Sequence, residues 1–296
     1  MQWMAHKAPH KKGTEVNDLC PFISREEISM KRMMTVLLCL LLCGCQNAAQ
    51  PDPQPVESLA PAQLVSEQVL HGESGDIHYS YQLPEGYSEN GSYPMMVVMP
   101  GYDMMWFGED SSGTNLDWQG FRCWSEQEDD MIVVSAQLTD WGEISACQAI
   151  ELTEHFLDDF AVDAKRVYAA GYSAGGETMS RAVSMRPDLY AAYLHAASQW
   201  DGTYAPIAEN GVGVYIYIAQ NDEYYGSQQA QETYDALYAA HQEAGLDEAQ
   251  IDALLQIQTP ADAYFAEHDA GGYYHAAANI VFDDADVLSW ILSHHK

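Results

Sequence analysis

The segment Gly-Tyr-Ser-Ala-Gly-Gly holds the residues best suited to chemistry. Gly171, Ser173 and Gly175 follow the pattern G-x-S-x-G, between an apolar segment and a helical one. In a tight strand-to-helix turn the flanking residues must be glycine, because a Cβ would collide with neighbouring backbone, and the turn pushes the serine hydroxyl out above the sheet edge. We therefore expect Ser173 to be a nucleophile rather than a buried turn residue.

Strands and helices alternate around this motif. A β-rich opening with a hairpin is expected at 67–70 and 77–83. Central strands covered on both faces are predicted at the apolar runs 94–99, 131–136, 167–170, 192–196 and 212–219. Helices are predicted at 144–160, 174–185, 228–244 and 284–293. This alternation predicts one α/β domain with a mostly parallel sheet and helices on both faces.

From about residue 65 to residue 295 the chain resembles a group of secreted esterases with the α/β-hydrolase fold. The group is related to polyhydroxybutyrate depolymerases, feruloyl esterases and prolyl oligopeptidase-like hydrolases. The resemblance rests on three motifs: DAKRVYAAGYSAGG, AQNDEYYG after a strand, and a histidine ahead of a terminal W-x-L helix. It implies a single α/β-hydrolase domain over residues 65–296 and a Ser-Asp-His triad.

The resemblance also indicates the acid of the triad. A serine hydroxyl needs a base to take its proton and an acid to hold that base in one tautomer. Asp222 follows the apolar run 212–219, where the family carries this acid. Glu223 is the adjacent alternative, and Asp201 and Asp269 are weaker ones.

The base must be a histidine that follows the acid in the chain, because this fold has the order Ser, Asp/Glu, His. The histidines in that part of the chain are His241, His268, His275, His294 and His295. The first lies in a predicted helix and the last two end the chain. Of the two that remain in the glycine-rich segment 268–279, we favour His275, which matches the family's histidine before a run of small residues; His268 is the alternative.

An oxyanion site and a substrate-binding surface complete the predicted site. Backbone N–H groups must hold the oxyanion, one from the residue after the nucleophile and one from the loop after the third strand. These are Ala174 and Tyr102. Aromatic side chains in and beyond the loop 102–124, among them Trp106, Trp200 and Tyr224, could line a cleft for an aryl or sugar-linked ester. Equally, these rings could simply pack the loop against the sheet.

The first 64 residues are predicted to be targeting sequence and tether. Residues 30–44 combine a basic start with a short apolar run and read as a lipoprotein signal peptide that ends at a lipidated Cys45. Residues 1–29 then lie upstream of the true start, and 45–64 form a tether. The apolar run is too short to span a membrane. We expect an extracytoplasmic lipoprotein attached to the membrane by its N-terminal lipid, either at the cell surface or in the periplasm.

The cysteines beyond Cys45 are Cys123 and Cys147, and an oxidising compartment predicts a disulfide between them, with two buried thiols as the alternative. With 12 basic and 44 acidic residues the chain has a net charge of -32, which argues against nucleic acid as a partner. No cofactor is implied, and the spacing of His268, Asp269 and His275 fits no standard zinc pattern.

Together these features predict a serine hydrolase that cleaves a carboxylic ester, in a small molecule or linked to a polymer, through an acyl-enzyme on Ser173. A serine peptidase of the prolyl oligopeptidase type is the alternative enzyme, because the same triad cleaves either bond. The alternative outside the enzymes is a surface-binding lipoprotein that keeps the fold without turnover.

Overall fold

An eight-stranded mixed sheet organises the computed structural model, which describes residues 62–108, 111 and 113–296. The strands are β1 (Gln63–Gly72), β2 (Gly75–Leu83), β3 (Tyr93–Met99), β4 (Ile132–Gln137), β5 (Val162–Tyr172), β6 (Ala192–Ala196), β7 (Gly213–Tyr217) and β8 (Leu255–Gln258). They lie in the order β1-β2-β4-β3-β5-β6-β7-β8. The pairs β1–β2 and β2–β4 are antiparallel, and every neighbouring pair from β4 to β8 is parallel. The predicted signal peptide, Cys45 and most of the predicted tether lie outside the described residues.

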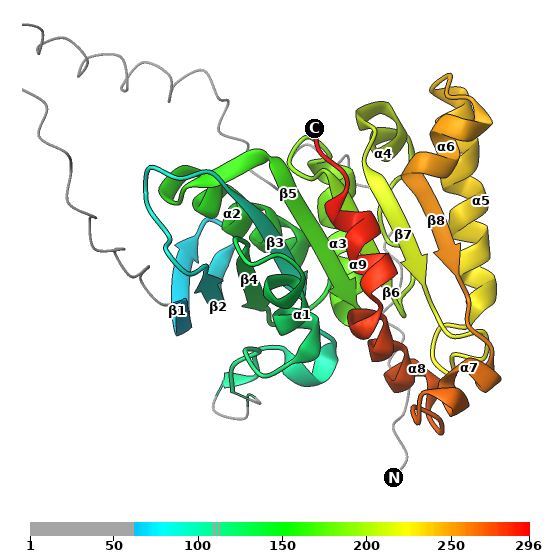
Figure 1. Ribbon diagram of the computed structural model, residues 1–296, viewed down its shortest axis with the longest axis horizontal. Coiled ribbons are helices and arrows are strands. Elements are labelled where there is room, and N and C mark those ends of the chain that lie inside the picture. Colours follow the sequence, from blue (N-terminus) through cyan, green and yellow to red (C-terminus); the bar gives the residue numbers. More distant parts are fainter. Residues whose placement is uncertain (1–61, 109–110, 112) are drawn as a thin grey trace, which may run out of the picture. The chain divides into compact units, whose positions relative to one another are not determined.

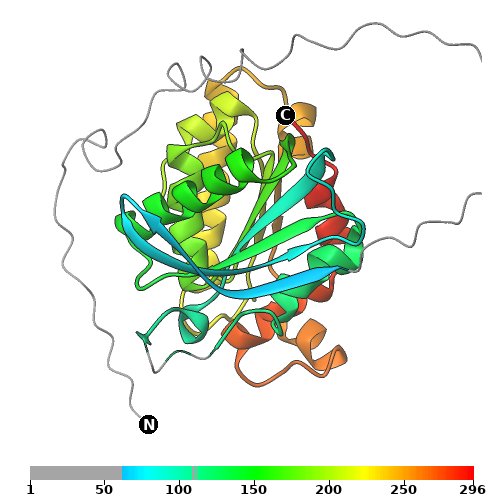
Figure 2. The same ribbon diagram turned by 90° about the vertical axis from the view of Figure 1, so that its left-hand side faces the viewer.

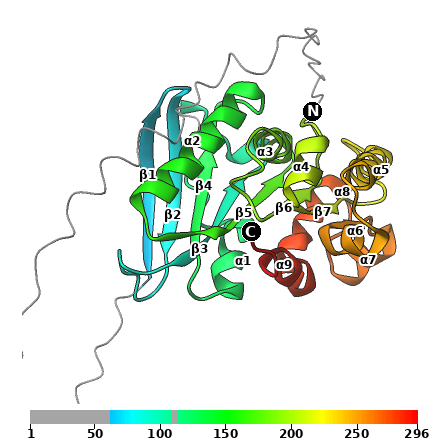
Figure 3. The same ribbon diagram turned by 90° about the horizontal axis from the view of Figure 1, so that it is seen from above.

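Helices cover both faces of the sheet, as Figures 2 and 3 show. One face carries α2 (Glu143–Asp159), α3 (Ala174–Met185), α4 (Ala205–Asn210) and α5 (Ser227–Glu243). The opposite face carries α1 (Gln119–Gln127) and α9 (Ala285–Leu292). We call these the α3 face and the α9 face. Each has its own apolar core, and β3 between them is almost wholly buried, as its apolar sequence predicts.

The remaining elements join the strands or lie at the carboxyl ends of the parallel strands. The helix α6 (Glu248–Leu254) leads into β8. A short 3₁₀ turn, η2 (Tyr102–Met104), follows β3, and β8 is followed by α7 (Asp262–Glu267), α8 (Tyr274–Ala277) and η4 (Ala278–Asp283). In Figure 1 the arrowheads of β5, β7 and β8 point toward the end of the sheet where α7 and α8 lie. Loops from distant parts of the chain therefore meet at this one edge.

The predicted fold class is confirmed by this architecture: a single α/β domain with a mostly parallel sheet and helices on both faces. The predicted helix 174–185 has the observed bounds of α3. Described residues contain no helix long and apolar enough to cross a membrane.

The outer strand β1 is irregular. Its pairing with β2 shifts register between Val65 and Gln68, and Glu67 has a φ of 56°, a conformation that side chains other than glycine seldom adopt. No further strand pairs with the outer side of β1 among the described residues. The sheet thus ends, on this side, in a strand bent by a bulge.

The predicted disulfide between Cys123 and Cys147 is wrong. Cys123 is a free, buried thiol on α1, within the core of the α9 face. Cys147 lies on α2, whose neighbouring residues Ala146 and Ala149 belong to the core of the α3 face. Because α1 and α2 flank β4 on opposite faces, the sheet separates two cysteines that are close in sequence.

We expect Cys123 to be unreactive in the folded protein. Burial raises the pKa of its thiol, so little of the reactive thiolate forms. Because only 2% of the residue is exposed, a reagent also has little access to the sulfur. Mass spectrometry after iodoacetamide treatment without reductant should find Cys123 unmodified in native protein and alkylated in guanidinium. Rapid alkylation of the native protein would contradict the packing of α1 described above.

Candidate active site

The strand β5 ends in a sharp turn that places Ser173 at the start of α3. Ser173 has φ 54° and ψ -123° and forms the N-cap of the helix. A Cβ on Gly175 would lie 2.2 Å from the carbonyl oxygen of Met99, and one on Gly171 would lie 2.6 Å from that of Gly175. The turn therefore requires glycine at both positions, as the sequence predicts, and the nucleophile keeps a conformation that its surroundings enforce.

The structure brings Ser173, His275 and Asp222 together in one hydrogen-bonded chain. The Oγ of Ser173 lies 2.9 Å from Nε2 of His275, and Nδ1 of His275 lies 2.8 Å from Oδ2 of Asp222. All three residues are buried. An ionised carboxylate only accepts hydrogen bonds, so Nδ1 carries the proton and Nε2 is left to accept from the serine hydroxyl.

Backbone groups hold Asp222 in its ionised form. Its Oδ1 accepts from the N–H groups of Tyr224, at 2.9 Å, and Tyr225, at 2.8 Å. Burial alone would raise the pKa of Asp222, but the hydrogen bonds from His275 and from these two N–H groups outweigh burial and lower it. The carboxylate is thus fixed in position and charge beside the imidazole.

Glu223, the alternative acid, holds the histidine's backbone instead of its ring. Its carboxylate accepts from the N–H of Tyr274 at 3.1 Å and from that of His275 at 3.0 Å. From the other side, the hydroxyl of Tyr172 donates to the carbonyl oxygen of His275 at 2.6 Å. Two neighbours of the predicted residues therefore fix the short helix α8.

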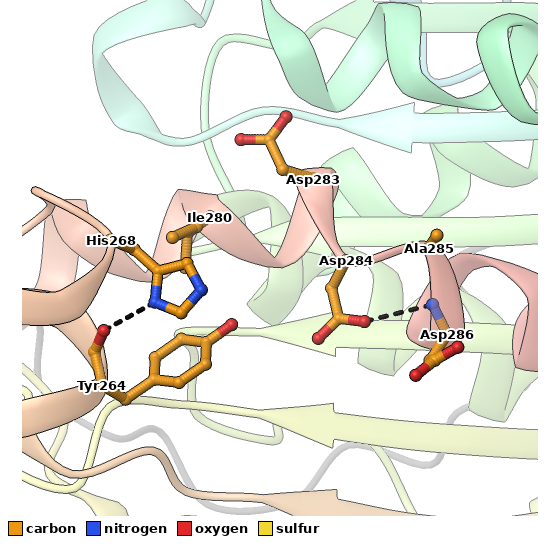
Figure 4. Close-up of a pocket in the computed structure, with 7 residues that line it drawn as sticks. All are labelled: Tyr264, His268, Ile280, Asp283, Asp284, Ala285 and Asp286. Atoms are coloured by element: carbon orange, nitrogen blue, oxygen red, sulfur yellow. Dashed lines mark hydrogen bonds between the residues drawn. The ribbon is translucent and has the colours of Figure 1, made fainter.

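His268, the alternative base, lies away from the nucleophile. It is exposed, its Nδ1 donates to the carbonyl oxygen of Tyr264 at 2.7 Å, and it borders an open acidic pocket with Asp283 and Asp284 (Figure 4). The side-chain carboxylate of Asp284 caps α9 there, because it accepts from the backbone N–H groups of Asp286 and Val287. No cluster of three or more His, Cys, Asp or Glu side chains suited to a metal occurs among the described residues.

The predicted oxyanion donors lie on the correct side of the nucleophile. A Cβ on Gly101 would lie 3.5 Å from the Cβ of Ser173, so the backbone that leads into η2 at Tyr102 runs beside the elbow. Ala174 is the first residue of α3. In the described part of the chain neither Tyr102 nor Ala174 uses its N–H in a hydrogen bond. Both groups are available to a developing negative charge.

The predicted aromatic residues divide between the site and the packing. Tyr224 is 69% exposed, and its ring centroid lies 5.4 Å from that of His275. Trp200 packs instead on Tyr204. Trp106 stacks on His78 of β2, with the two ring centroids 3.5 Å apart. Of the three, Tyr224 alone contacts a triad residue.

A buried carboxylate beside the nucleophile was not anticipated from the sequence. Glu177 lies one helical turn after Ser173, and it accepts from the hydroxyl of Tyr225 and from Nε2 of Gln199. Burial raises the pKa of Glu177. The signal was present in the motif, since a glutamate four residues after the nucleophile must lie on the same side of the helix as that serine.

Comparisons with known proteins agree with this fold. A sequence model of the prolyl oligopeptidase family matches residues 135–262, which include Ser173 and Asp222. A search of curated proteins gave no match. A thermostable esterase superposes with a TM-score of 0.62 at 15% identity, over 80% of this chain and 64% of the esterase.

Two further structures represent the two enzyme classes. A putative dipeptidyl aminopeptidase IV from Bacteroides ovatus gives a TM-score of 0.54 at 12% identity, over 82% of this chain and 37% of the peptidase. The feruloyl esterase module from Clostridium thermocellum, complexed with sinapinate, gives 0.52 at 15% identity, over 85% of this chain and 96% of the module. The chain therefore has the α/β-hydrolase fold, and its residues 135–262 are similar to the prolyl oligopeptidase family.

Proposed function

We propose that the chain is a serine hydrolase that cleaves carboxylic esters. The observation that carries this proposal is the continuous hydrogen-bonded chain from Ser173 through His275 to Asp222. A buried structural serine would not need an imidazole at its hydroxyl and a carboxylate behind that imidazole.

Acylation begins when Oγ of Ser173 attacks the ester carbonyl carbon while its proton passes to Nε2 of His275. The carbonyl oxygen becomes an oxyanion, which accepts from the N–H groups of Ala174 and Tyr102. Asp222 stabilises the imidazolium without taking its proton. When the tetrahedral intermediate collapses, the bond to the alcohol oxygen breaks, and that oxygen takes the proton from Nε2.

Deacylation repeats these steps with water. His275 takes a proton from water as the water oxygen attacks the acyl carbon, and the new oxyanion occupies the same two N–H groups. Collapse then breaks the bond to Oγ of Ser173, which recovers its proton from Nε2. The products are a carboxylic acid and an alcohol, and these steps require no other group.

A peptidase activity is the second candidate, and the family match supports it. The ester is favoured because the present chain and the feruloyl esterase module cover each other almost completely, whereas the chain covers 37% of the peptidase. A panel of p-nitrophenyl, acetyl-sugar and feruloyl esters, assayed beside dipeptide p-nitroanilides, distinguishes the two. Faster turnover of the anilides would make the peptidase the correct assignment.

A binding protein without turnover is the third possibility, and active-site labelling tests it. A fluorophosphonate should modify Ser173, because this reagent requires an activated serine. Mass spectrometry of the labelled peptide identifies the residue. Absence of labelling, together with absence of ester hydrolysis, would leave only the binding role.

We also propose that the enzyme works outside the cytoplasm as a lipoprotein, with its lipid on Cys45. The basis is sequence alone: a basic start at Lys31 and Arg32, a short apolar run and a terminal cysteine. The strongly acidic domain would be soluble at such a surface.

The variant Cys45→Ala should move the protein out of the membrane fraction, because stable attachment requires more than one acyl chain and the variant has no site for them. Fractionation followed by immunoblotting measures this, and Cys123→Ala is the matched control with the parental distribution. Equal membrane binding by Cys45→Ala and the parent would show that the anchor lies elsewhere or does not exist.

A further inference from the structure

The backbone of His275 is held on both sides by residues that take no part in the proton transfers. Its N–H donates to the carboxylate of Glu223 at 3.0 Å, and its carbonyl oxygen accepts from the hydroxyl of Tyr172 at 2.6 Å. Glu223 directly follows Asp222 in the chain, and Tyr172 directly precedes Ser173. The chain neighbours of the acid and of the nucleophile therefore both bind the backbone of the base.

The helix α8 cannot hold the base in place alone. It has four residues, and its N-cap, Tyr273, supplies no side-chain hydrogen bond. The first N–H groups of a helix have no acceptor within the helix, and a helix this short is not stable without outside contacts. Glu223 supplies the missing acceptors, to Tyr274 at 3.1 Å and to His275 at 3.0 Å. The start of α8 is thus capped by the loop that carries the acid.

Tyr172 holds α8 from within the core. It is the last residue of β5, it is 6% exposed, and its ring centroid lies 5.7 Å from that of His275. The rings of Trp118 and Phe282 pack around it. Burial raises the pKa of Tyr172, so its hydroxyl keeps the proton that it donates to the carbonyl oxygen of His275. The strand that ends at the nucleophile therefore also fixes the base.

These two backbone contacts determine where the imidazole can reach. Asp222 binds the ring at one atom, Nδ1, at 2.8 Å. A bond at one atom leaves a ring free to tilt, so Nε2 stays 2.9 Å from Oγ of Ser173 only if the backbone of His275 is fixed as well. Proton transfer depends on this distance, and a displacement of about 1 Å can lower a rate by about 100-fold.

We propose that Tyr172 and Glu223 are positioning residues that act through the backbone of His275, and we call this pair the backbone clamp. The kinetic test of the clamp rests on the proposed ester hydrolysis, whereas its structural tests need no substrate. Neither residue transfers a proton or binds the ester, so loss of either should lower kcat and leave KM unchanged.

Tyr172→Phe is the direct test, because it keeps the ring and removes the hydroxyl. The buried carbonyl oxygen of His275 then lacks its donor, which disfavours the present position of α8. We expect kcat for p-nitrophenyl acetate to fall at least about 10-fold, with KM within about 2-fold of the parental value. Tyr168→Phe is the matched control and should keep parental kcat, because this hydroxyl on the same strand donates to the carbonyls of Leu292 and His294. Parental kcat in Tyr172→Phe would overturn the clamp.

Glu223→Ala tests the other contact of the clamp. Because Glu223 is exposed, water can replace part of each lost bond, and we expect a smaller fall in kcat of about 5-fold, again with KM unchanged. Asp284→Ala is the matched control, since it removes a carboxylate that caps α9 through the N–H groups of Asp286 and Val287. This control should keep parental kcat. Parental kcat in Glu223→Ala would overturn the role of Glu223.

A proton resonance reports the position of the base without turnover. The proton on Nδ1 of His275, shared with Asp222, should give a far-downfield NMR signal that is absent from His275→Ala. The signal should shift or broaden in the two clamp variants and match the parent in the two controls. An unchanged signal in both clamp variants would overturn the clamp even if esters are hydrolysed. Absence of ester hydrolysis, with the signal altered as expected, would instead remove the proposed function and leave the clamp standing.

Hydrogen exchange in the parental protein requires no variant, so it decides the matter if a clamp variant fails to fold. The N–H groups of Tyr274 and His275 should exchange at least about 10-fold more slowly than those of an unstructured peptide, because Glu223 accepts from both. Exchange of both at the rate of an unstructured peptide would overturn the clamp.

Discussion

Ser173→Ala is expected to lower kcat for p-nitrophenyl acetate by about 10⁴ to 10⁶. The substitution removes the one oxygen that both bonds to Nε2 of His275 and lies beside the oxyanion donors. No acyl-enzyme can form, so only binding and the oxyanion site remain to assist direct attack by water. The initial rate at saturating ester, corrected for background hydrolysis, measures the loss.

The fold of Ser173→Ala should be intact, because alanine fits the space that the serine leaves. Circular dichroism should match the parent, and Ser125→Ala, a serine on α1 far from the triad, should retain parental kcat. A Ser173→Ala protein that keeps a tenth of the parental rate would mean that another residue is the nucleophile.

His275→Ala should cause a loss of similar size, about 10⁴ or more in kcat, because the members of a triad act as a unit. Without the imidazole, Oγ of Ser173 has no acceptor for its proton and the alcohol has no donor. Labelling of Ser173 by a fluorophosphonate should slow in parallel, which separates loss of the base from loss of ester binding.

The matched control is His268→Ala. Its ring is exposed and bonded to the carbonyl of Tyr264, so we expect near-parental kcat. The reverse outcome, with His268→Ala inactive and His275→Ala active, would refute the hydrogen-bonded chain seen here while leaving Ser173 as the nucleophile.

Local constraints explain why the elbow and its helix could be predicted. A Cβ at position 171 or 175 would lie 2.6 or 2.2 Å from a backbone oxygen, so both positions require glycine. The two glycines therefore make the turn recognisable in the sequence. The strand before it is apolar because both faces are covered, and the helix after it ends just before Pro187, which cannot continue a helix. The order of acid and base along the chain then follows from the topology.

Features that depend on contacts between residues far apart in the chain could not be predicted from the sequence. The strand β8 has four residues and no apolar run, and it exists because β7 offers it a parallel partner. The pairing of Cys123 with Cys147 was wrong because composition does not say on which face a helix packs. The bond between Glu177 and Tyr225 joins residues 48 positions apart.

The bulge in β1 has a consequence for the protein at high concentration. A straight outer strand offers a regular row of N–H and C=O groups to any second chain that approaches it. The register shift between Val65 and Gln68 interrupts that row, and Glu67 at its centre places a negative charge where an equally acidic copy would have to dock. The bulge around Glu67 that bends β1 therefore also opposes the pairing of this strand with a strand of a second molecule.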